Sequence, residues 1–274
     1  MAEQTFTIKA LQLEDVPEAA QLSSDAFLAD RQTQMKALGR NPFNLKEYHM
    51  QSLPEMLKSP RCVILKAVDN ETGEFAGFCN WGLIGFSPSE MPELEGRIQP
   101  PERPAAAPAS QSEDDKDDEG EERNKKPEKE EASPPKQSVT PGPEAVPDAE
   151  DDPIERLQAL TGADLDAWQK EVMPPGTKCL VVIGLSVSPK FQRRGIGSAL
   201  LRWGTNICDE AGVFAWVHSS EPAWRAYEKA GFEVIRCLDV DLDEYAPCPP
   251  PDEGPGAKWG HYVFRYMKYF PANG

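Results

Sequence analysis

The alternation of hydrophobic and polar residues in the first 87 residues predicts a strand, two helices and a β-hairpin. From Thr5 to Ala10 apolar and polar residues alternate, as in a half-buried strand. Asp15 followed by Pro17 is typical of a helix start. Pro54 is expected to interrupt the second helix. In chain order the expected elements are a strand at 5–10, a helix from about 16, a helix at 45–57 and hairpin strands at 62–68 and 74–84.

The last 122 residues show a second series of strands and helices. Leu180–Val187 is almost continuously apolar, which indicates a strand buried on both faces. The expected elements are short helices at 153–160 and 165–171, a strand at 180–187, a helix at 195–211, a strand at 213–217, a helix at 222–230 and strands at 232–240 and 261–267. This order predicts an α/β fold, an α+β sandwich with helices on both faces of a mixed central sheet.

The two series are separated by a stretch of different composition. Between Glu102 and Asp152 there are 17 acidic and 7 basic side chains, and 113–131 contains no apolar side chain apart from glycine and proline. Such a segment cannot bury enough apolar surface to offset the entropy lost on ordering. We therefore expect a disordered acidic insertion at 88–152 that divides one domain into an N-terminal part, 1–87, and a C-terminal part, 153–274.

Charge and cysteine usage narrow the classes of partner. The formal net charge is -17, which disfavours nucleic acid and anionic membrane surfaces. No apolar run approaches the roughly 18 residues of a membrane span, and the N-terminus does not resemble a signal peptide, so we expect a cytoplasmic protein, with the nucleus as the alternative. None of the six cysteines forms a CxxC pair, so we expect neither a metal site nor a disulfide framework.

The segment with recognisable chemistry joins the strand at 180–187 to the helix that follows. After Val187 the chain reads Ser-Pro-Lys-Phe and then Gln-Arg-Arg-Gly-Ile-Gly over 192–197. The first N–H groups of a helix have no internal partner and lie at the positive end of its dipole. Gly195 and Gly197 would let phosphate oxygens approach the backbone, and Arg193 and Arg194 add positive charge. The segment therefore predicts an anion site.

Two nucleotide-binding patterns also place glycines at a strand-to-helix turn. A dinucleotide fingerprint requires a glycine at 200, where this chain has Leu200, and the ATP-binding pattern GxxxxGK[ST] does not occur at this turn. Glycines are found at such turns for purely structural reasons as well, and spacing alone leaves that interpretation open.

Gln192–Gly197 resembles the Q/R-x-x-G-x-G/A motif of the GNAT acetyltransferases, and it follows Val-x-Pro as in that family. Ala226–Phe232, with its Tyr-x-x-x-Gly-Phe, resembles the family's second signature. Val217–Glu221 is similar to a stretch of puromycin N-acetyltransferase-like members. The resemblance covers the C-terminal part closely and the N-terminal part only in the order of strands and helices.

The resemblance implies the GNAT fold and acetyl-CoA as cosubstrate, with no metal. The cofactor would lie where the strands at 180–187 and 213–219 move apart, with its pyrophosphate on the backbone of 193–198. The cofactor-binding residues carried over from the family are Leu185, Ser186, Val187, Gln192, Arg193, Arg194, Gly195, Ile196, Gly197, Ser198, Ser220 and Trp224.

Two residues are candidates for proton transfer. By resemblance, Tyr227 would protonate the leaving thiolate, although packing alone also accounts for a tyrosine there. The family often has a glutamate on its fourth strand, and 178–187 contains no carboxylate. His218, with an ordinary pKa near 6.5, is the nearest candidate base, and a structural histidine, Glu221 or a water chain are the alternatives.

These observations predict an N-acetyltransferase that acts on the amine of a small molecule. Acetylation of a protein lysine or N-terminus, and a non-catalytic acyl-CoA-binding module, are the alternatives. The sequence does not identify the acceptor or the oligomeric state.

Overall fold

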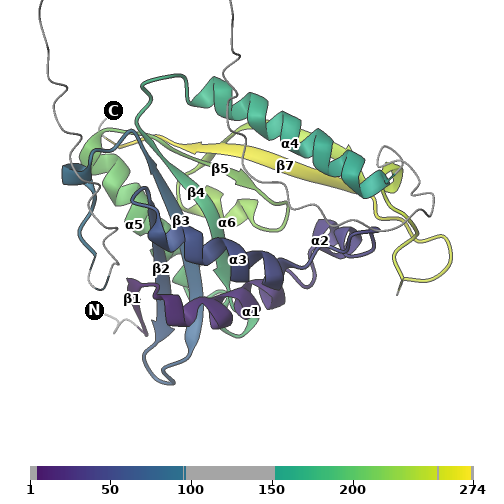
Figure 1. Cartoon of the computed structure of the whole chain (residues 1–274), viewed down its shortest axis with the longest axis horizontal. Coiled ribbons are helices and arrows are strands. Elements are labelled where there is room, and N and C mark those ends of the chain that lie inside the picture. Colours follow the sequence, from purple (N-terminus) through teal and green to yellow (C-terminus); the bar gives the residue numbers. More distant parts are fainter. Residues whose placement is uncertain (1–4, 95, 97–151, 252, 273–274) are drawn as a thin grey trace, which may run out of the picture. The chain divides into compact units, whose positions relative to one another are not determined.

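The computed structural model describes residues 5–94, 96, 152–251 and 253–272, which fold around a seven-stranded sheet. The strand order is β1-β2-β3-β4-β5-β7-β6, and every neighbouring pair is antiparallel except β4 with β5 (Figure 1). The strands are β1 Phe6–Ala10, β2 Cys62–Asp69, β3 Phe75–Ile84, β4 Cys179–Val187, β5 Ala215–Ser219, β6 Glu233–Asp241 and β7 His261–Tyr269. The mixed sheet expected from the sequence is confirmed.

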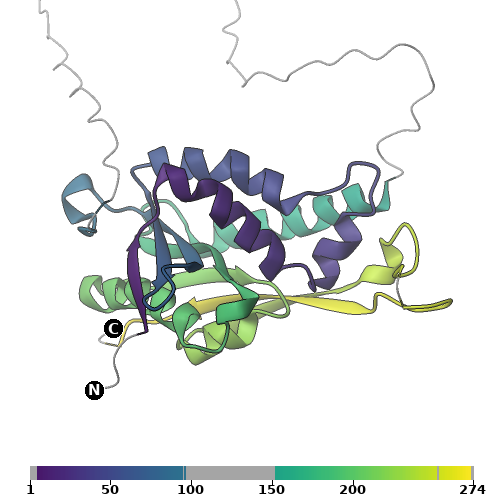
Figure 2. The ribbon, with the colours of Figure 1, turned by 90° about the horizontal axis from the view of Figure 1, so that it is seen from below.

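Helices cover both faces of this sheet. The helices α1, α3 and α4 pack on one face and α5 and α6 on the other, as the purple-to-blue and green helices of Figure 2 show for α1, α3 and α5. Their bounds are α1 Val16–Ala26, α2 Arg31–Lys36, α3 Leu45–Lys58, α4 Pro153–Val172, α5 Ile196–Ala211 and α6 Trp224–Lys229, with 3-10 turns at Leu13–Asp15, Pro88–Glu90, Pro189–Phe191 and Leu242–Glu244. The expected two-sided fold is confirmed.

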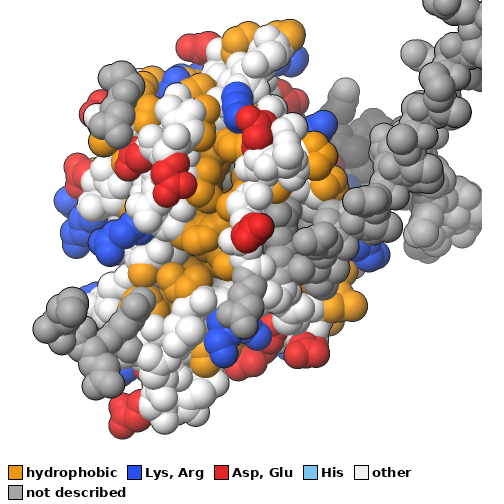
Figure 3. Space-filling view, turned by 90° about the vertical axis from the view of Figure 1, so that its left-hand side faces the viewer, with side chains coloured by type: hydrophobic (Ala, Val, Ile, Leu, Met, Phe, Trp, Pro, Cys, Tyr) orange, Lys and Arg blue, Asp and Glu red, His pale blue; other side chains and the backbone are white. Residues whose placement is uncertain are grey.

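The side chains on the surface carry charges of both signs. In the view of Figure 3 a band of hydrophobic side chains runs between acidic and basic ones. Ion pairs on the described surface include Lys190 with Glu74, at 2.5 Å, and Lys178 with Glu90, at 2.7 Å. The net charge of -17 therefore does not act as a uniform negative field over this face.

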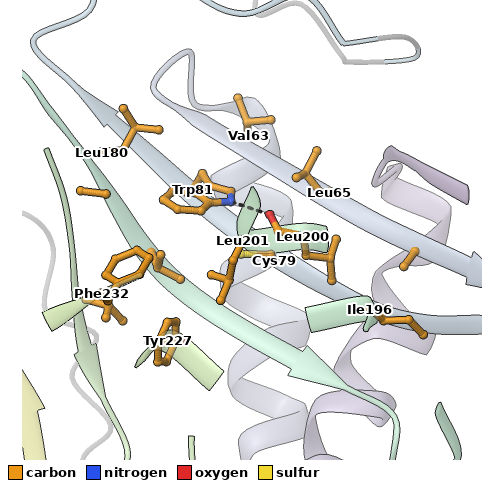
Figure 4. Close-up of a cluster of buried hydrophobic side chains, with 14 of the residues drawn as sticks. Val63, Leu65, Cys79, Trp81, Leu180, Ile196, Leu200, Leu201, Tyr227 and Phe232 are labelled. Carbon is orange, nitrogen blue, oxygen red and sulfur yellow. Dashed lines mark hydrogen bonds between the residues drawn. The ribbon is translucent and has the colours of Figure 1, made fainter. Parts of the chain in front are cut away.

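The larger hydrophobic core lies between the sheet and α5. Trp81 of β3 is fully buried and donates a hydrogen bond from its indole Nε1 to the carbonyl of Leu200 at 3.3 Å (Figure 4). Leu201, Tyr227 and Phe232 join the same cluster, so α5 and α6 share one core with the sheet.

On the opposite face α4 is fixed to the last strands by Asp164. One carboxylate oxygen of Asp164 accepts a hydrogen bond from Tyr266 Oη at 2.5 Å, and the other pairs with the guanidinium of Arg236. The rings of Trp168 and Tyr266 lie 5.0 Å apart. This contact holds α4 over β7 and β6.

The pairing of β3 with β4, in the middle of the sheet, joins the two parts of the chain that flank the expected insertion. Strand β3 pairs with β4 from Gly77 opposite Val187 to Ile84 opposite Cys179. Of the expected disordered segment at 88–152, residues 95 and 97–151 lie outside the described residues. At the start of the same expected segment, Gln12 Nε2 donates to the carbonyl of Gly96 at 2.6 Å, and Glu90 pairs with Lys178. Residues 88–94 and 96 thus lie against the domain.

Three expected details of the helices are wrong. Pro153–Val172 forms one helix instead of two, and Pro54 lies inside a continuous α3. The short helix α2 was not expected at all. Asp30 caps it, since its side chain accepts a hydrogen bond from the backbone N–H of Thr33 at 2.9 Å.

Candidate active site

The two parallel strands at the centre of the sheet pair over only part of their length. Strand β4 pairs with β5 from Leu180 opposite Ala215 to Val182 opposite Val217, and the two arrows then diverge (Figure 1). The register of β4 on β3 also shifts here, which leaves Ile183 outside the ladder and 45% exposed. Beyond Val182 the β5-facing backbone of β4 is therefore open to a ligand.

The loop after β4 turns sharply into the N-terminus of α5. Gln192 Nε2 donates to the carbonyl of Val187 at 3.2 Å and ties the loop to the strand end. Arg193 has a φ of 63° and Gly195, the N-cap of α5, has a φ of 82°. The N–H groups of the first turn of α5 have no intrahelical acceptors, so this end of the helix suits an anion.

The two arginines of the loop have different surroundings. The guanidinium of Arg194 lies 3.7 Å from Asp69 and 5.1 Å from the ring centroid of Phe191. Arg193 is exposed, and we find no ion pair for it among the described residues. The positive charge of Arg194 therefore has an acidic side chain nearby, whereas we find none for that of Arg193 among the described residues.

A cavity of about 490 Å³ occupies the gap between the diverging strands. It is bounded by β4 and β5, by α2 and α4 on one face of the sheet and by α6 on the other. Its lining residues are Phe27, Gln32, Lys36, Phe43, Gln158, Thr161, Gly162, Leu165, Val182, Ile183, Gly184, Leu185, Val217, His218, Ser220, Ala223, Tyr227 and Phe264.

Tyr227 of α6 reaches the cavity from the side of α5. It is buried, with 4% of its surface exposed, and its ring lies 5.8 Å from that of Phe232. Burial raises the pKa of its hydroxyl far above the usual value. Within the described chain we find no hydrogen-bond partner for this hydroxyl, which is thus a protonated donor at the cavity wall.

His218 of β5 lies at the opposite face of the gap. Its ring is stacked between Phe264, at 5.1 Å, and Tyr266, at 4.7 Å. Burial, and secondarily the charge of Lys36, lower the pKa of His218 to about 4. This departs from the value near 6.5 expected from the sequence. Its Nε2 is buried without a hydrogen-bond partner among the described residues.

The other candidates from the sequence fall into two groups. Leu185 and Ser220 line the cavity together with Tyr227 and His218. Ser186 instead points toward α1, where its hydroxyl lies 3.0 Å from that of Ser23, so only its backbone faces the gap. The carboxylate of Glu221 accepts the backbone N–H of Val263 at 3.2 Å and holds β7 in place.

Trp224 and the remaining loop residues do not line the cavity. The Trp224 ring lies beside the guanidinium groups of Arg225 and Arg265, at 4.5 and 4.6 Å. Val187 packs on the core, and Gly197 is close enough to Val187 that an added Cβ would lie 3.7 Å from its Cγ2. Ile196 is buried and Ser198 half-buried at the start of α5.

The residues on the other side of the cavity were not expected from the sequence. Phe27, Lys36 and Phe43 come from α2 and its flanking loops, and Thr161 and Leu165 from the middle of α4. A signal for α2 was present in Asp30 and Thr33, whose spacing is typical of a helix cap. No local motif distinguishes Lys36 from a surface lysine.

A second cavity of about 660 Å³ adjoins the first one. The two share Phe27 and Phe43, and the second is also lined by Leu45, Pro250 and Trp259. Among the described residues no three His, Cys, Asp or Glu side chains form a group that could hold a metal ion. Nor does that part of the chain contain a helix long and apolar enough to cross a membrane.

Part of the chain is similar to a known protein family. Residues 113–232 match the model of the acetyltransferase (GNAT) family. A curated protein described as an acetyltransferase, from Stachybotrys chartarum, is 38% identical over 68 residues, which is 25% of this chain and 25% of that protein. The matched stretch thus spans a quarter of the relative's length.

Solved structures with a similar arrangement have low sequence identity. One is a histone acetyltransferase HPA2 and related acetyltransferase from Corynebacterium glutamicum (14% identity, 98% of this chain and 97% of that chain, TM-score 0.47). Another is a Drosophila melanogaster polyamine N-acetyltransferase (13% identity, 97% and 99%, TM-score 0.49). These likenesses do not bear on the acceptor. Residues 113–232 are thus similar to the GNAT acetyltransferases.

Proposed function

We propose that this chain, whose residues 113–232 match the GNAT acetyltransferase family, is an acetyl-CoA-dependent N-acetyltransferase for the amine of a small molecule. The observation that carries the proposal is the divergence of β4 from β5 beside the glycine-capped N-terminus of α5. The open strand edge suits the amide groups of the pantetheine arm, and the helix end suits the pyrophosphate. Acetyl-CoA would supply the acetyl group as a thioester.

In this proposal residues on the two faces of the sheet have different roles. The backbone of 185–187 and of 193–198 would bind the cosubstrate from the side of α5. Tyr227, on the same side, would give its proton to the leaving thiolate. His218, on the acceptor side, is neutral above about pH 4 and would accept a hydrogen bond from the incoming amine. A buried ring nitrogen without a partner is suited to that contact.

The proposal is tested by two matched glycine substitutions at the ends of α5. Gly195 and Gly212 both have positive φ values, 82° and 64°, and a Cβ added at either one meets nothing within 4 Å. Gly195→Val and Gly212→Val should therefore strain the backbone similarly. Only Gly195→Val places a side chain at the expected pyrophosphate position.

We expect Gly195→Val to weaken acetyl-CoA binding by more than about 10-fold in calorimetry, a loss of about 1.4 kcal/mol or more, and Gly212→Val to leave it unchanged. Equal affinities of the two variants would contradict the assigned cosubstrate site. Release of the CoA thiol in the presence of amines then separates an enzyme from a non-catalytic acyl-CoA-binding module.

A protein lysine or N-terminus is the second candidate acceptor. The cavity beyond Phe27 and Phe43 favours it, because it gives room for a larger acceptor. Thiol release measured with peptides and with small amines distinguishes the two classes of acceptor. A higher kcat/KM for peptides would replace the small-molecule proposal.

A further inference from the structure

Among the described residues that line the cavity, one side chain is cationic and none is a carboxylate. Among its described lining residues, Lys36, His218 and Tyr227 are the ionisable ones. His218 has a pKa of about 4 and Tyr227 a strongly raised pKa, so both are neutral at physiological pH. Lys36 therefore sets the sign of the charge that a bound acceptor meets.

The charge of Lys36 is not neutralised by a contact in the described chain. Asp30 is the nearby anion, but one of its oxygens accepts from Tyr262 Oη at 2.8 Å. The other accepts from the backbone and hydroxyl of Thr33, at 2.9 and 2.8 Å. We find no ion pair or hydrogen bond to Lys36 Nζ, which lies 5.5 Å from the ring centroid of Phe43.

Burial lowers the pKa of Lys36, and the charge of Asp30 raises it. A partly desolvated ammonium without a close counter-ion gains free energy when an anion enters beside it. Charges elsewhere on the surface act weakly here, because salt screens exposed charges over roughly 8 Å. The net charge of the whole chain therefore does not decide which acceptor binds.

The walls around Lys36 are apolar. Phe27, Phe43 and Phe264 present aromatic rings, and Leu165 and Ile183 add aliphatic surface. Such a surface favours an acceptor with an aromatic or aliphatic side chain. A second ammonium on the acceptor would meet the charge of Lys36 with no carboxylate of the described lining to offset it.

We propose that the acceptor is a primary amine that also carries a carboxylate and an apolar group, and that Lys36 binds the carboxylate. This inference rests on the proposed acetyltransferase function. The ammonium acceptor and acetyl-CoA form the N-acetyl carboxylate, the CoA thiol and one released proton. The N–C bond forms as the C–S bond breaks, and the thiolate takes one proton of the acceptor's ammonium by way of Tyr227.

The test compares acceptors that differ only by a carboxylate. Phenylalanine, tyrosine and tryptophan are paired with phenethylamine, tyramine and tryptamine, and putrescine serves as a diamine. Each is assayed with the full chain, with Lys36→Met and with Lys46→Met, an exposed lysine of α3 outside the lining of this cavity. Methionine keeps most of the length of the side chain and removes its charge.

We expect the amino acids to be acetylated in preference to their decarboxylated partners. Lys36→Met should raise KM for the amino acids about 10–100-fold and leave KM for the arylalkylamines unchanged or lower. Lys46→Met should change neither. A preference for putrescine or the arylalkylamines, or an equal loss of kcat for both sets in Lys36→Met, would overturn the assignment.

Binding of the products separates this inference from the proposed activity. N-acetylphenylalanine, N-acetyltyrosine and N-acetyltryptophan are titrated calorimetrically against their decarboxylated N-acetyl counterparts. We expect tighter binding of at least one carboxylate, lost in Lys36→Met, whether or not turnover is observed. If no carboxylate binds more tightly than its counterpart, the role of Lys36 is wrong. If carboxylates bind but no amine is acetylated, the enzyme proposal fails by itself.

Discussion

Tyr227 and His218 approach one cavity from opposite faces of the sheet. Tyr227 belongs to the core under α5, whereas His218 is stacked on the aromatic rings of β7 under α4. They meet at the cavity because β5 turns away from β4 after three residue pairs. The proposed proton donor, Tyr227, and the proposed contact to the amine, His218, thus lie on separate sides of one cavity.

Removal of the Tyr227 hydroxyl should affect turnover more than binding. Tyr227→Phe keeps the ring that packs on Phe232 and deletes only the proton donor. We expect kcat to fall by about 10–10³-fold with KM for acetyl-CoA little changed, because only the transition state needs the proton. Steady-state thiol release measures both constants. An unchanged kcat would mean that Tyr227 only packs.

The lowered pKa of His218 should appear in the pH dependence of stability. Its ordinary pKa of 6.5 falls to about 4 in the fold, so the unfolded chain binds more protons between these values. The contribution of neutral His218 to stability is therefore complete above pH 6.5 and is lost as pH falls toward 4. His218→Phe keeps a ring in the stack without this titration.

We expect the Tm of the wild type to fall relative to that of His218→Phe between pH 7 and 4.5. His261 is the control, because Asp239 raises its pKa, and its contribution is instead lost as pH rises. Tm curves of wild type and His218→Phe that stay parallel would show that the ring is not desolvated. For activity, His218 should add no pH limb near 6.5.

Local motifs determined which of these residues were identified from sequence. Gln192–Gly197 and Tyr227 could be proposed from sequence because their expected functions depend on a loop and a helix that neighbouring residues define. Lys36 could not be proposed from sequence, because its place in the cavity wall arises only when α2 and β5 lie on the same cavity. The pKa of His218 was misjudged because the rings that bury it, Phe264 and Tyr266, come from a later strand.

At the scale of elements, helix α5 and strand β3 approach each other closely at Gly204. A Cβ built on Gly204 would lie 2.3 Å from the indole of Trp81, which is fully buried. The indole also donates to the carbonyl of Leu200 in the same helix. Helix α5 can therefore lie this close to the sheet only with glycine at 204.

Gly204→Ala should destabilise the fold although alanine favours helices. The rigid indole must move, which costs about 1–3 kcal/mol of the free energy of unfolding. Gly162→Ala in α4 is the matched control, since its Cβ meets nothing within 4 Å and should stabilise by up to about 1 kcal/mol. Denaturant unfolding compares the two. Similar effects of both substitutions would contradict the close contact.

The errors in the expected helices have related causes. Pro54 and Gly162 are weak helix formers, and local propensity alone predicts an interruption or a boundary at each. In α3 the neighbouring Leu53 is fully buried, and in α4 Leu157 and Trp168 are buried on either side of Gly162. The packing of these anchors outweighs a local propensity cost of about 1 kcal/mol for glycine and about 3 for proline. The strands were predicted better because each is marked locally, either by alternating apolar and polar residues or by a short apolar run.

At the scale of the whole molecule, one sheet is built from both flanks of the acidic stretch. Strands β1 to β3 precede it and β4 to β7 follow it, and β3 and β4 lie side by side. Asp152 caps α4 and also accepts the backbone N–H of Arg40 at 3.3 Å, so the N-terminus of α4 is tied to the segment that follows α2.

Removal of 101–150 should leave the domain intact. The described residues on the two flanks already form the sheet and both of its helical faces. A deletion variant with a short glycine-serine linker should keep the Tm within a few degrees and bind acetyl-CoA with unchanged affinity. Circular dichroism and calorimetry measure these outcomes. An unfolded product would show that the segment contributes to the core.

Because β4 and β5 diverge, part of β4 has unpaired backbone groups, like an edge strand, although it lies in the middle of the sheet. Edge strands expose unpaired backbone groups that can pair with another chain, and proteins ordinarily protect them. Here residues 183–185 of this edge line a cavity, which limits the access of another chain. Amide hydrogens on this edge should therefore exchange with solvent faster than those of the neighbouring β3. A ligand bound along the edge would slow that exchange, because it would pair with the backbone as an eighth strand would.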